Sequence, residues 1–210
     1  MKKVILLPLL LTLTIACTKT YYLDKLGEGV KKGDIEKINY ALEHGVDINS
    51  QDLRDECETA LMLASSAYGG NVEIVKYLIS KGADINLQTD NDGWTPLMNA
   101  AHYGEIEIVK LLLSMGVDIY IENEDKETAL IIAAANNQVE IVKLLLAFDK
   151  KAHKNNKYKQ ALLNNAYFEA SLNGNYEVVQ YLISSGAEVN CRNSDGSTVL
   201  ISMQILNTHC

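Results

Sequence analysis

The stretch of sequence that decides the fold is residues 92–123, which read DGWTPLMNAAHYGEIEIVKLLLSMGVDIYIEN. Asp92-Gly93 is a turn dipeptide, and Thr95 stands where its hydroxyl can cap the helix that follows. Pro96 suits the first helical position, because the N–H that proline lacks would be unpaired there in any case. Gly104 can adopt the positive φ with which many helices end. These residues predict a first helix that opens at Thr95-Pro96 and ends at Gly104.

A second helix follows within the same stretch. Ile106, Val109, Leu112 and Leu113 recur at helical spacing and form one apolar face. Gly116 ends this helix, and the small residues 100–101 of the first helix let a neighbouring helix approach closely. The stretch therefore predicts one helix–turn–helix unit that leads into the next turn.

The same order of signals recurs along the chain. Thr95 and Thr128 lie 33 residues apart, and so do Asn165 and Thr198. The units close on similar runs, which are 45–49 (GVDIN), 82–86 (GADIN), 116–118 (GVD) and 186–190 (GAEVN). One such unit cannot bury its apolar face alone, so several must stack to form a continuous core.

This pattern resembles the ankyrin repeat, and the resemblance covers residues 22–210. It implies an all-α fold, a solenoid of stacked helix–turn–helix units with protruding hairpin loops. We expect units at 22–53, 54–88, 89–121, 122–153 and 154–191, followed by a half unit at 192–210. That half unit has a first helix and no second, so it is expected to act as a cap or to fray.

Several positions depart from the family pattern. The unit at 54–88 carries extra residues around 66–70. In the unit at 122–153, non-glycine residues stand where glycines are usual, so its turns are expected to be tighter or distorted; these residues are Lys126, Asn137 and Asp149. The histidine that often follows Thr-Pro-Leu is also replaced, which puts its usual polar network in doubt; the replacements are Met62, Met98 and Ile131.

Residues 149–160 are basic, whereas the chain as a whole is acidic. One acid, Asp149, is accompanied by five lysines, which are Lys150, Lys151, Lys154, Lys157 and Lys159. A solvated loop inserted between units is one interpretation, and contact with acidic lipid head groups or an acidic partner is the other. Helical spacing over 158–172 predicts that a longer helix replaces the usual hairpin there.

The first residues predict an export signal. Lys2 and Lys3 precede an apolar run over 4–16, which is shorter than the roughly 20 residues that a membrane-spanning helix needs. Residues 14–17, Thr-Ile-Ala-Cys, resemble the lipobox of bacterial lipoproteins, although an aliphatic residue is usual where Thr14 stands. We expect a signal peptide at 1–16, a lipidated Cys17 and a linker at 17–21. A plain secretory signal and a buried N-terminal helix are the alternatives.

Lipidation would anchor the protein to a membrane of the bacterial cell envelope, in the periplasm or on the outer surface. Cys57, Cys191 and Cys210 would then remain. Three unpaired thiols are the expected state, and a Cys191–Cys210 disulfide, which export permits, is the alternative. No spacing of Cys or His suggests a metal site, and no cofactor is expected.

Charge and motifs exclude other classes of function. The formal net charge is −8, and removal of residues 1–16 would delete two lysines and bring it to −10. An acidic chain disfavours nonspecific binding of nucleic acid, which needs clustered Lys and Arg. The four histidines are scattered over different units, and neither a phosphate loop nor a nucleophile elbow is present in the sequence. We therefore predict that the protein is not an enzyme.

The resemblance also implies where a partner protein binds, which is the concave surface of hairpin tips and first helices. Trp94 is the only tryptophan, and aromatic residues often anchor interfaces. Local packing for Trp94, and a solvated helix end for His102 and Tyr103, are the alternatives. The acids at 55–58 and 124–127 form either a soluble rim or a surface that steers a basic partner. The candidate partner-binding residues are Trp94, Tyr103, His102, Asp92, Asn91, Glu58, Glu127 and Asn136.

These features together predict an exported, lipid-anchored module that acts as a monomer and binds one or a few partner proteins. A second hypothesis is an immunity or inhibitor protein that occludes a toxic or degradative enzyme. A third is a structural scaffold of the cell envelope.

Overall fold

The computed structural model describes residues 20–51, 58–66, 70–149, 156–192 and 198–199. Residues 20–32 are helical, so the helix already includes Thr20 and Tyr21 of the expected linker. The helices that follow are α2 (Ile35–Glu43), α3 (Ala60–Ala64), α4 (Val72–Ser80), α5 (Pro96–Tyr103), α6 (Ile106–Ser114), α7 (Ala129–Ala135), α8 (Val139–Asp149), α9 (Asn156–Leu172) and α10 (Tyr176–Ser184).

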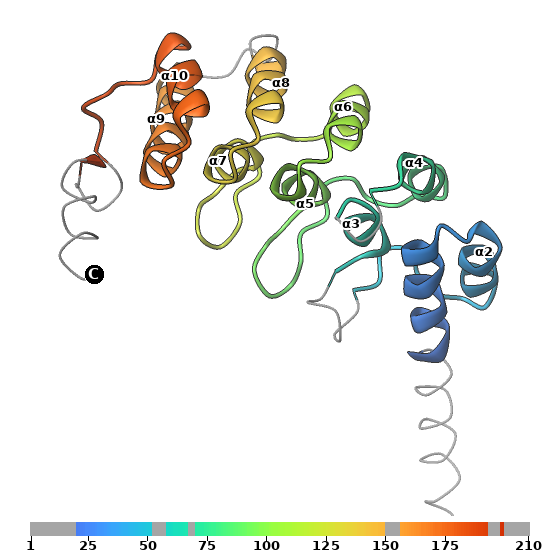
Figure 1. Ribbon diagram of the computed structural model, residues 1–210. Coiled ribbons are helices and arrows are strands. Elements are labelled where there is room, and N and C mark those ends of the chain that lie inside the picture. Colours follow the sequence, from blue (N-terminus) through green and yellow to red (C-terminus); the bar gives the residue numbers. More distant parts are fainter. Residues whose placement is uncertain (1–19, 52–57, 67–69, 150–155, 193–197, 200–210) are drawn as a thin grey trace, which may run out of the picture.

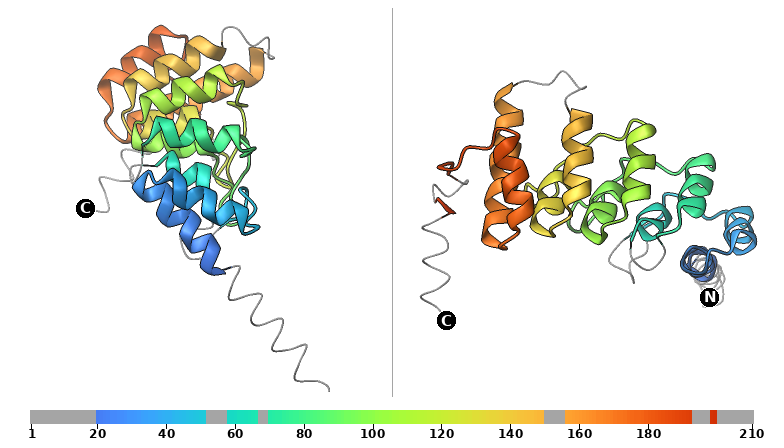
Figure 2. Two further views of the ribbon diagram at one scale, coloured as in Figure 1. Left: turned by 90° about the vertical axis from the view of Figure 1, so that its right-hand side faces the viewer. Right: turned by 45° about the horizontal axis from the view of Figure 1, so that its top comes forward.

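The helices are arranged as antiparallel pairs stacked in one curved row (Figures 1 and 2). The first helices α3, α5 and α7 form one layer, and the second helices α4, α6 and α8 form the other. The loops that join successive pairs project to one side, next to the first helices. No β-strand occurs in the part of the chain that the structure describes. The predicted all-α solenoid of helix–turn–helix units is confirmed.

Short polar side chains begin the helices as the sequence predicts. The Thr95 Oγ1 accepts a hydrogen bond of 3.2 Å from the Met98 N–H at the start of α5. At α3 the Thr59 Oγ1 accepts from the Met62 N–H at 3.2 Å, and the Met62 Sδ accepts from the Thr59 N–H at 3.4 Å. Met62, which stands where the family often has histidine, therefore completes a reciprocal cap instead.

The core is continuous from unit to unit. The largest fully buried side chains come from both helices of successive pairs and include Leu61, Leu97, Ile108, Leu112, Ile141 and Leu145. Alanines at 100, 101, 133 and 134 are also fully buried, which allows the first helices to approach one another closely. Each inner unit therefore packs its apolar surface against both neighbours. The stability of the array depends on these contacts between neighbouring units.

The closing runs form a ladder between neighbouring units. The Asn49 Oδ1 accepts a hydrogen bond of 2.9 Å from the Asp84 N–H of the next unit. In the same way the Asn86 Oδ1 accepts from the Asp118 N–H, again at 2.9 Å. The recurring asparagine of GVDIN and GADIN therefore pairs a backbone donor in the following unit, which explains its repetition.

The turns of the unit at 122–153 keep the ordinary shape, contrary to expectation. Lys126 has a φ of 64° and Asn137 a φ of 58°, whereas the equivalent Gly93 and Gly104 have 74° and 79°. These two residues adopt the left-handed conformation of the glycines that they replace, at a cost of about 1–2 kcal/mol each for an L-residue. The prediction of tighter or distorted turns was wrong at both positions.

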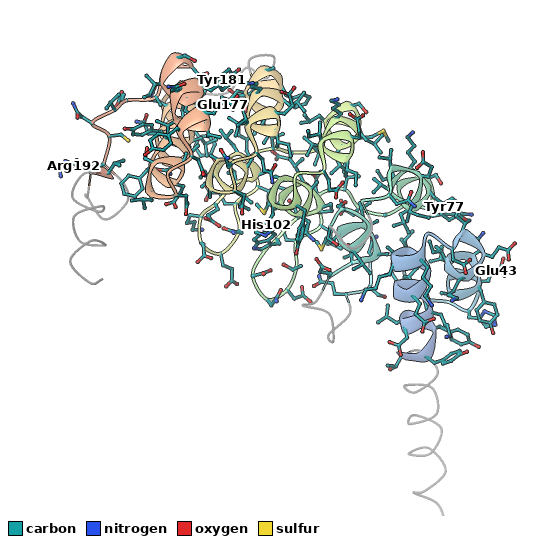
Figure 3. The ribbon with its side chains drawn as sticks, viewed as in Figure 1. Glu43, Tyr77, His102, Glu177, Tyr181 and Arg192 are labelled. Carbon is teal, nitrogen blue, oxygen red and sulfur yellow. The ribbon has the colours of Figure 1, made fainter. Side chains whose placement is uncertain are left out.

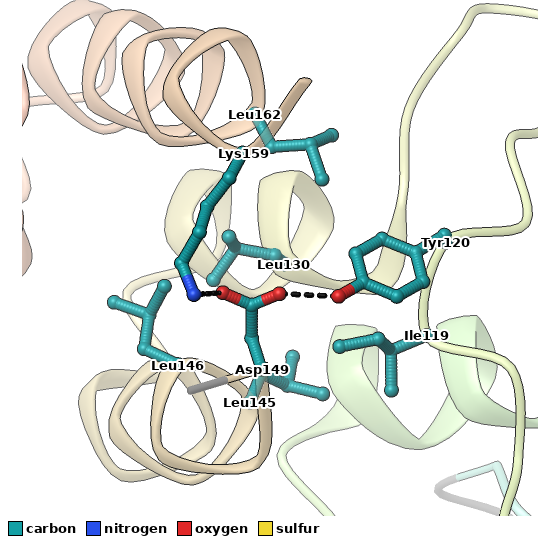
Figure 4. Close-up of a pocket in the computed structure, with 8 residues that line it drawn as sticks. All are labelled: Ile119, Tyr120, Leu130, Leu145, Leu146, Asp149, Lys159 and Leu162. Carbon is teal, nitrogen blue, oxygen red and sulfur yellow. Dashed lines mark hydrogen bonds and ion pairs between the residues drawn. The ribbon is translucent and has the colours of Figure 1, made fainter. Parts of the chain in front are cut away.

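The third departure, Asp149, changes the helix instead of the turn. The second helix of this unit, α8, runs on to Asp149, which is buried against the preceding hairpin. Tyr120 stands where the two preceding units have their ladder asparagine, and its hydroxyl donates to the Asp149 Oδ1. The Lys159 ammonium, from the first turns of α9, contacts the Asp149 Oδ2 (Figure 4). An ion pair between the buried Asp149 carboxylate and the partly exposed Lys159 ammonium therefore replaces the asparagine ladder at this junction.

Helix α9 confirms the longer helix expected over 158–172, since it has 17 residues. The Tyr158 hydroxyl donates to the Glu122 Oε1 at 3.1 Å and fastens α9 to the preceding hairpin. Burial, reinforced by this bond to a carboxylate, raises the pKa of Tyr158 to about 12. Of the five lysines in this region, Lys159 is thus bound internally. Lys150, Lys151 and Lys154 lie outside the described residues.

Other expectations also fall outside the described residues. These concern the signal peptide at 1–16, the lipidation of Cys17, the insertion at 67–69, Cys57, Cys210 and the end of the half unit at 200–210. Cys191 is described and is a buried free thiol. Burial raises the pKa of this thiol, and the nearby Glu188 carboxylate raises it further.

Candidate functional site

The loop between α4 and α5 holds Trp94 in a fixed position. The Trp94 N–H donates to the Thr89 Oγ1 at 2.7 Å, and the Trp94 carbonyl accepts from the Thr89 N–H at 2.8 Å. The Thr89 hydroxyl is in turn hydrogen-bonded to the Asp92 carboxylate. The turn itself comprises residues 90–92, so Trp94 lies beside the hairpin tip and not on it.

The Trp94 side chain is half-buried and packs against the core, which is the local packing that was the alternative to an exposed anchor. Its ring meets the His102 ring edge-on, with centroids 5.5 Å apart. The His102 ring meets the Tyr103 ring in the same manner at 4.8 Å. Figure 3 shows His102 on the side of α5 that faces the hairpins. The three predicted aromatic residues therefore form one continuous row.

A buried asparagine joins this row to the preceding unit. Asn99, in α5, is 4% exposed, and its Nδ2 donates to the Glu58 Oε1 at 2.5 Å and to the Met62 carbonyl at 3.3 Å. Glu58 directly precedes the helix cap Thr59. The bond therefore orients the Glu58 carboxylate towards the aromatic row of the next unit.

Glu58, Asn99 and the aromatic row line a hollow of about 240 Å³, which is open to solvent on the hairpin side of the array. Five of the eight predicted partner-binding residues line it, namely Glu58, Asp92, Trp94, His102 and Tyr103, and Thr89 and Asn99 complete the lining. The hollow is smaller than the roughly 300–1,000 Å³ that is usual for small-molecule sites. It is therefore of a size for one inserted side chain.

The remaining three predicted residues lie elsewhere on the same side. Asn91 is exposed at the hairpin tip. Asn136 is exposed at the end of α7, where its Nδ2 donates to the Ile132 carbonyl at 2.9 Å. Glu127 lies on the next hairpin, and its Oε2 accepts from the Asn123 Nδ2 at 3.1 Å. None of these three residues lines the hollow.

Asn99 was missed by the sequence reasoning, although a signal was present. Aligning the first helices on Thr59, Thr95, Thr128 and Asn165 places Asn99 in one column with Leu63, Ile132 and Glu169. Leu63 and Ile132 are aliphatic, so the two polar residues of this column, Asn99 and Glu169, indicate polar partners nearby. Burial raises the pKa of Glu169, and the negative charge of Glu127 raises it further. The column therefore marks two polar sites on this face, at Glu58–Asn99 and at Glu127–Glu169.

The described residues contain neither a metal-binding cluster nor a membrane-spanning helix. No cluster of three or more His, Cys, Asp or Glu side chains in the described ranges is arranged to hold a metal ion. None of the described helices combines the length and apolarity needed to cross a bilayer.

Comparison with known proteins identifies the repeat. A family model for ankyrin repeats (3 copies) matches residues 26–123 and 115–193, which together span most of the chain. No curated protein matches the chain at a significant level.

Proposed function

The chain belongs to the ankyrin-repeat family, and on that premise we propose that it is an exported, lipid-anchored module that binds one partner protein on the hairpin side of its middle units. Ankyrin repeats generally mediate protein–protein interaction and are not typically enzymatic. The observation that carries the proposal is the hollow between Glu58 and the aromatic row, because it gathers five candidate contact residues from two units. The module acts as a monomer in this proposal.

Truncating the aromatic row should weaken binding of the partner. Tyr103 is 43% exposed and ends the row, so Tyr103→Ala removes contact area with little loss of core packing. Truncation of an interface anchor costs roughly 2 kcal/mol or more, which is about a 30-fold loss of affinity. Trp94→Ala should weaken binding at least as much, with a modest loss of stability because its ring is half-buried.

The measurement is a titration of the partner, identified by crosslinking from membranes, against purified variants. Tyr176→Ala is the matched control, because Tyr176 is 81% exposed on α10, away from the hollow. Equal affinities for wild type, Tyr103→Ala and Trp94→Ala would show that the partner binds elsewhere, and the proposal would fail.

Export and anchoring are supported by the first residues and by the end of the array that follows them. Tyr21 and Tyr40 are exposed there, and the Tyr22 ring stacks on the His44 ring with centroids 4.4 Å apart. Tyrosine is enriched where proteins meet the membrane interface. A cluster of tyrosines beginning four residues after Cys17 suits an array held close to a bilayer.

Metabolic labelling with a fatty-acid analogue should mark the wild-type protein and not Cys17→Ala. The lipid is expected on this thiol alone, because the cysteine ends the lipobox-like run of residues 14–17. Cys57→Ala serves as the control and should label as strongly as the wild type. Equal labelling of wild type and Cys17→Ala, or no labelling of either, would leave plain secretion as the explanation of the N-terminal segment.

An inhibitor or immunity protein is the second candidate function. It is favoured by the two acids that line the hollow, Glu58 and Asp92, because a basic enzyme would be steered towards them. Such a protein would abolish the activity of its partner on binding, whereas a simple anchor or scaffold would leave that activity intact.

A further inference from the structure

We propose that the outer end of the first unit docks on the phospholipid interface of the membrane that holds the lipid anchor, through a cluster of four rings formed by Tyr21, Tyr22, Tyr40 and His44. This inference rests on the proposed lipid anchor for its setting, and it names the surface that meets the bilayer and the orientation of the array. It is carried by the length of the tether, by the packing and exposure of the rings, and by the charges beside them.

The tether between the anchor and the fold is short. Only residues 18 and 19 separate Cys17 from the helix of residues 20–32. Each residue of a fully extended chain spans at most about 3.6 Å, so Cys17 and Thr20 can be separated by at most about 11 Å. A lipidated Cys17 lies at the bilayer surface. The start of this helix is therefore held within reach of the phospholipid head groups.

Two helices bring the four rings together at this end of the row (Figure 1). The Tyr22 ring stacks on the His44 ring with centroids 4.4 Å apart, and the Tyr40 ring lies 4.2 Å from the His44 ring. The Tyr21 ring meets the Tyr22 ring edge-on at 5.3 Å. Tyr21 is 52% exposed and Tyr40 is 45% exposed. The cluster therefore presents aromatic surface outwards in an arrangement that the fold already fixes.

Tyrosine side chains of this kind suit a phospholipid interface. The ring is apolar and the hydroxyl is polar, so the ring can enter the edge of the acyl layer while the hydroxyl stays among the head groups. Because the rings are already packed, docking costs less conformational entropy than the ordering of free side chains would. The lipid tether also keeps the surface at a high effective concentration, so a weak affinity is sufficient for docking.

The charges beside the cluster do not favour docking on anionic lipid. Lys25 Nζ lies 3.3 Å and Lys37 Nζ 3.4 Å from the Glu28 Oε2, and the bond and charge of Lys25, followed by those of Lys37, lower the pKa of Glu28. Glu36 and Glu43 are exposed on α2. We therefore expect docking to depend on the rings, to occur on zwitterionic lipid and to persist at high salt.

Docking by this end would orient the array. The row of units extends from the helix of residues 20–32 to α10 at the opposite end (Figures 1 and 2). The middle units would then be held away from the bilayer, and their hairpin side would stay accessible to a partner protein.

Tryptophan emission in vesicles tests the surface. The full-length chain is produced with its own signal in a bacterial host and reconstituted into phosphatidylcholine vesicles that contain phosphatidylcholine spin-labelled on the head group. This lipid quenches tryptophans that lie close to the head groups. Single tryptophans are introduced in a Trp94→Phe background, as Tyr40→Trp in the cluster and as Tyr176→Trp, which is the matched control because Tyr176 is 81% exposed on α10. Tyr40→Trp should be quenched at least several-fold more than Tyr176→Trp, at low and at high salt.

Removal of one ring separates docking from simple tethering. In the Tyr40→Trp chain, Tyr21→Ser should lower the ratio of docked to undocked chains about 5-fold, which corresponds to about 1 kcal/mol for one ring. Tyr21→Phe keeps the ring and should leave the quenching unchanged. Circular dichroism checks that both variants stay folded. Equal quenching of Tyr40→Trp and Tyr176→Trp, loss of quenching at high salt, or equal quenching with the two Tyr21 variants would overturn the inference.

The two proposals fail in different ways. If labelling shows lipid on Cys17 while Tyr40→Trp is not quenched, the anchor stands and the docking surface is wrong. If Tyr40→Trp is quenched as expected while the partner ignores Tyr103 and Trp94, the docking surface stands and the proposed binding face is wrong. If Cys17 carries no lipid, the anchor is wrong and the tethered docking fails with it.

Discussion

Replacing Lys159 by methionine should lower the free energy of unfolding by about 3 kcal/mol, because it leaves the buried carboxylate of Asp149 without its cation. The side chain of Asp149 is 8% exposed, and that of Lys159 is 34% exposed. The partial exposure of the lysine lets water screen the pair, so we expect the lower end of the range for fully buried pairs. Methionine keeps most of the apolar stem of lysine, so the change isolates the charge. Urea denaturation followed by circular dichroism measures the effect.

Two further variants make this result specific. Asp149→Asn in the Lys159→Met background should recover much of the loss, because an amide is far less costly to bury than an unpaired carboxylate. Lys143→Met is the matched control, since the Lys143–Glu177 pair is 3.8 Å long and its side chains are 40% and 71% exposed. Exposed pairs contribute at most about 1 kcal/mol. If Lys159→Met and Lys143→Met have the same small effect, the contact at Asp149 does not stabilise the junction.

The repeat, the helix caps and the burial of the apolar faces could be predicted from the sequence, because each depends on residues close together in the chain. Thr95 caps α5 through a residue three positions away, and Leu112 lies on the apolar face that its spacing indicates. The long helix α9 was also predicted, since the same helical periodicity extends through it. Local signals of this kind need no knowledge of the neighbouring units.

The junction before α9 could not be predicted in the same way. Asp149 departs from a family glycine, which suggested a distorted turn, whereas its carboxylate is held by Tyr120 and Lys159 from other elements. Recognising this network requires three departures to be considered together: an acid for a glycine, a tyrosine for the ladder asparagine, and a lysine ten residues after the acid. Each of these three departures, taken alone, looks like ordinary sequence variation between repeats. Only their meeting in space shows that they compensate one another.

The candidate site was predictable in part for a related reason. Trp94, His102 and Tyr103 belong to one unit, so their proximity follows from the helix and the hairpin that precedes it. The contribution of Asn99 does not follow, because its bond to Glu58 joins residues 41 positions apart. The family pattern placed Glu58 on the same face as the aromatic residues, but only the stacking of units brings its carboxylate to the aromatic row of the next unit.

Replacing Leu112 by alanine should lower the free energy of unfolding by about 2–5 kcal/mol, because it removes a fully buried side chain from the core and leaves a cavity. Leu112 lies in α6, at the centre of the array, and is 0% exposed. The stability of a solenoid is a sum of unit and neighbour terms, so a cavity here weakens the unit and its packing on both sides. Leu111→Ala is the matched control, because Leu111 is half-buried in the same helix and has the same helix propensity. Urea denaturation of both variants should give a distinctly larger loss for Leu112→Ala. A loss under roughly 1 kcal/mol, or one no greater than that of Leu111→Ala, would mean that the central units do not share the core that this stacking requires.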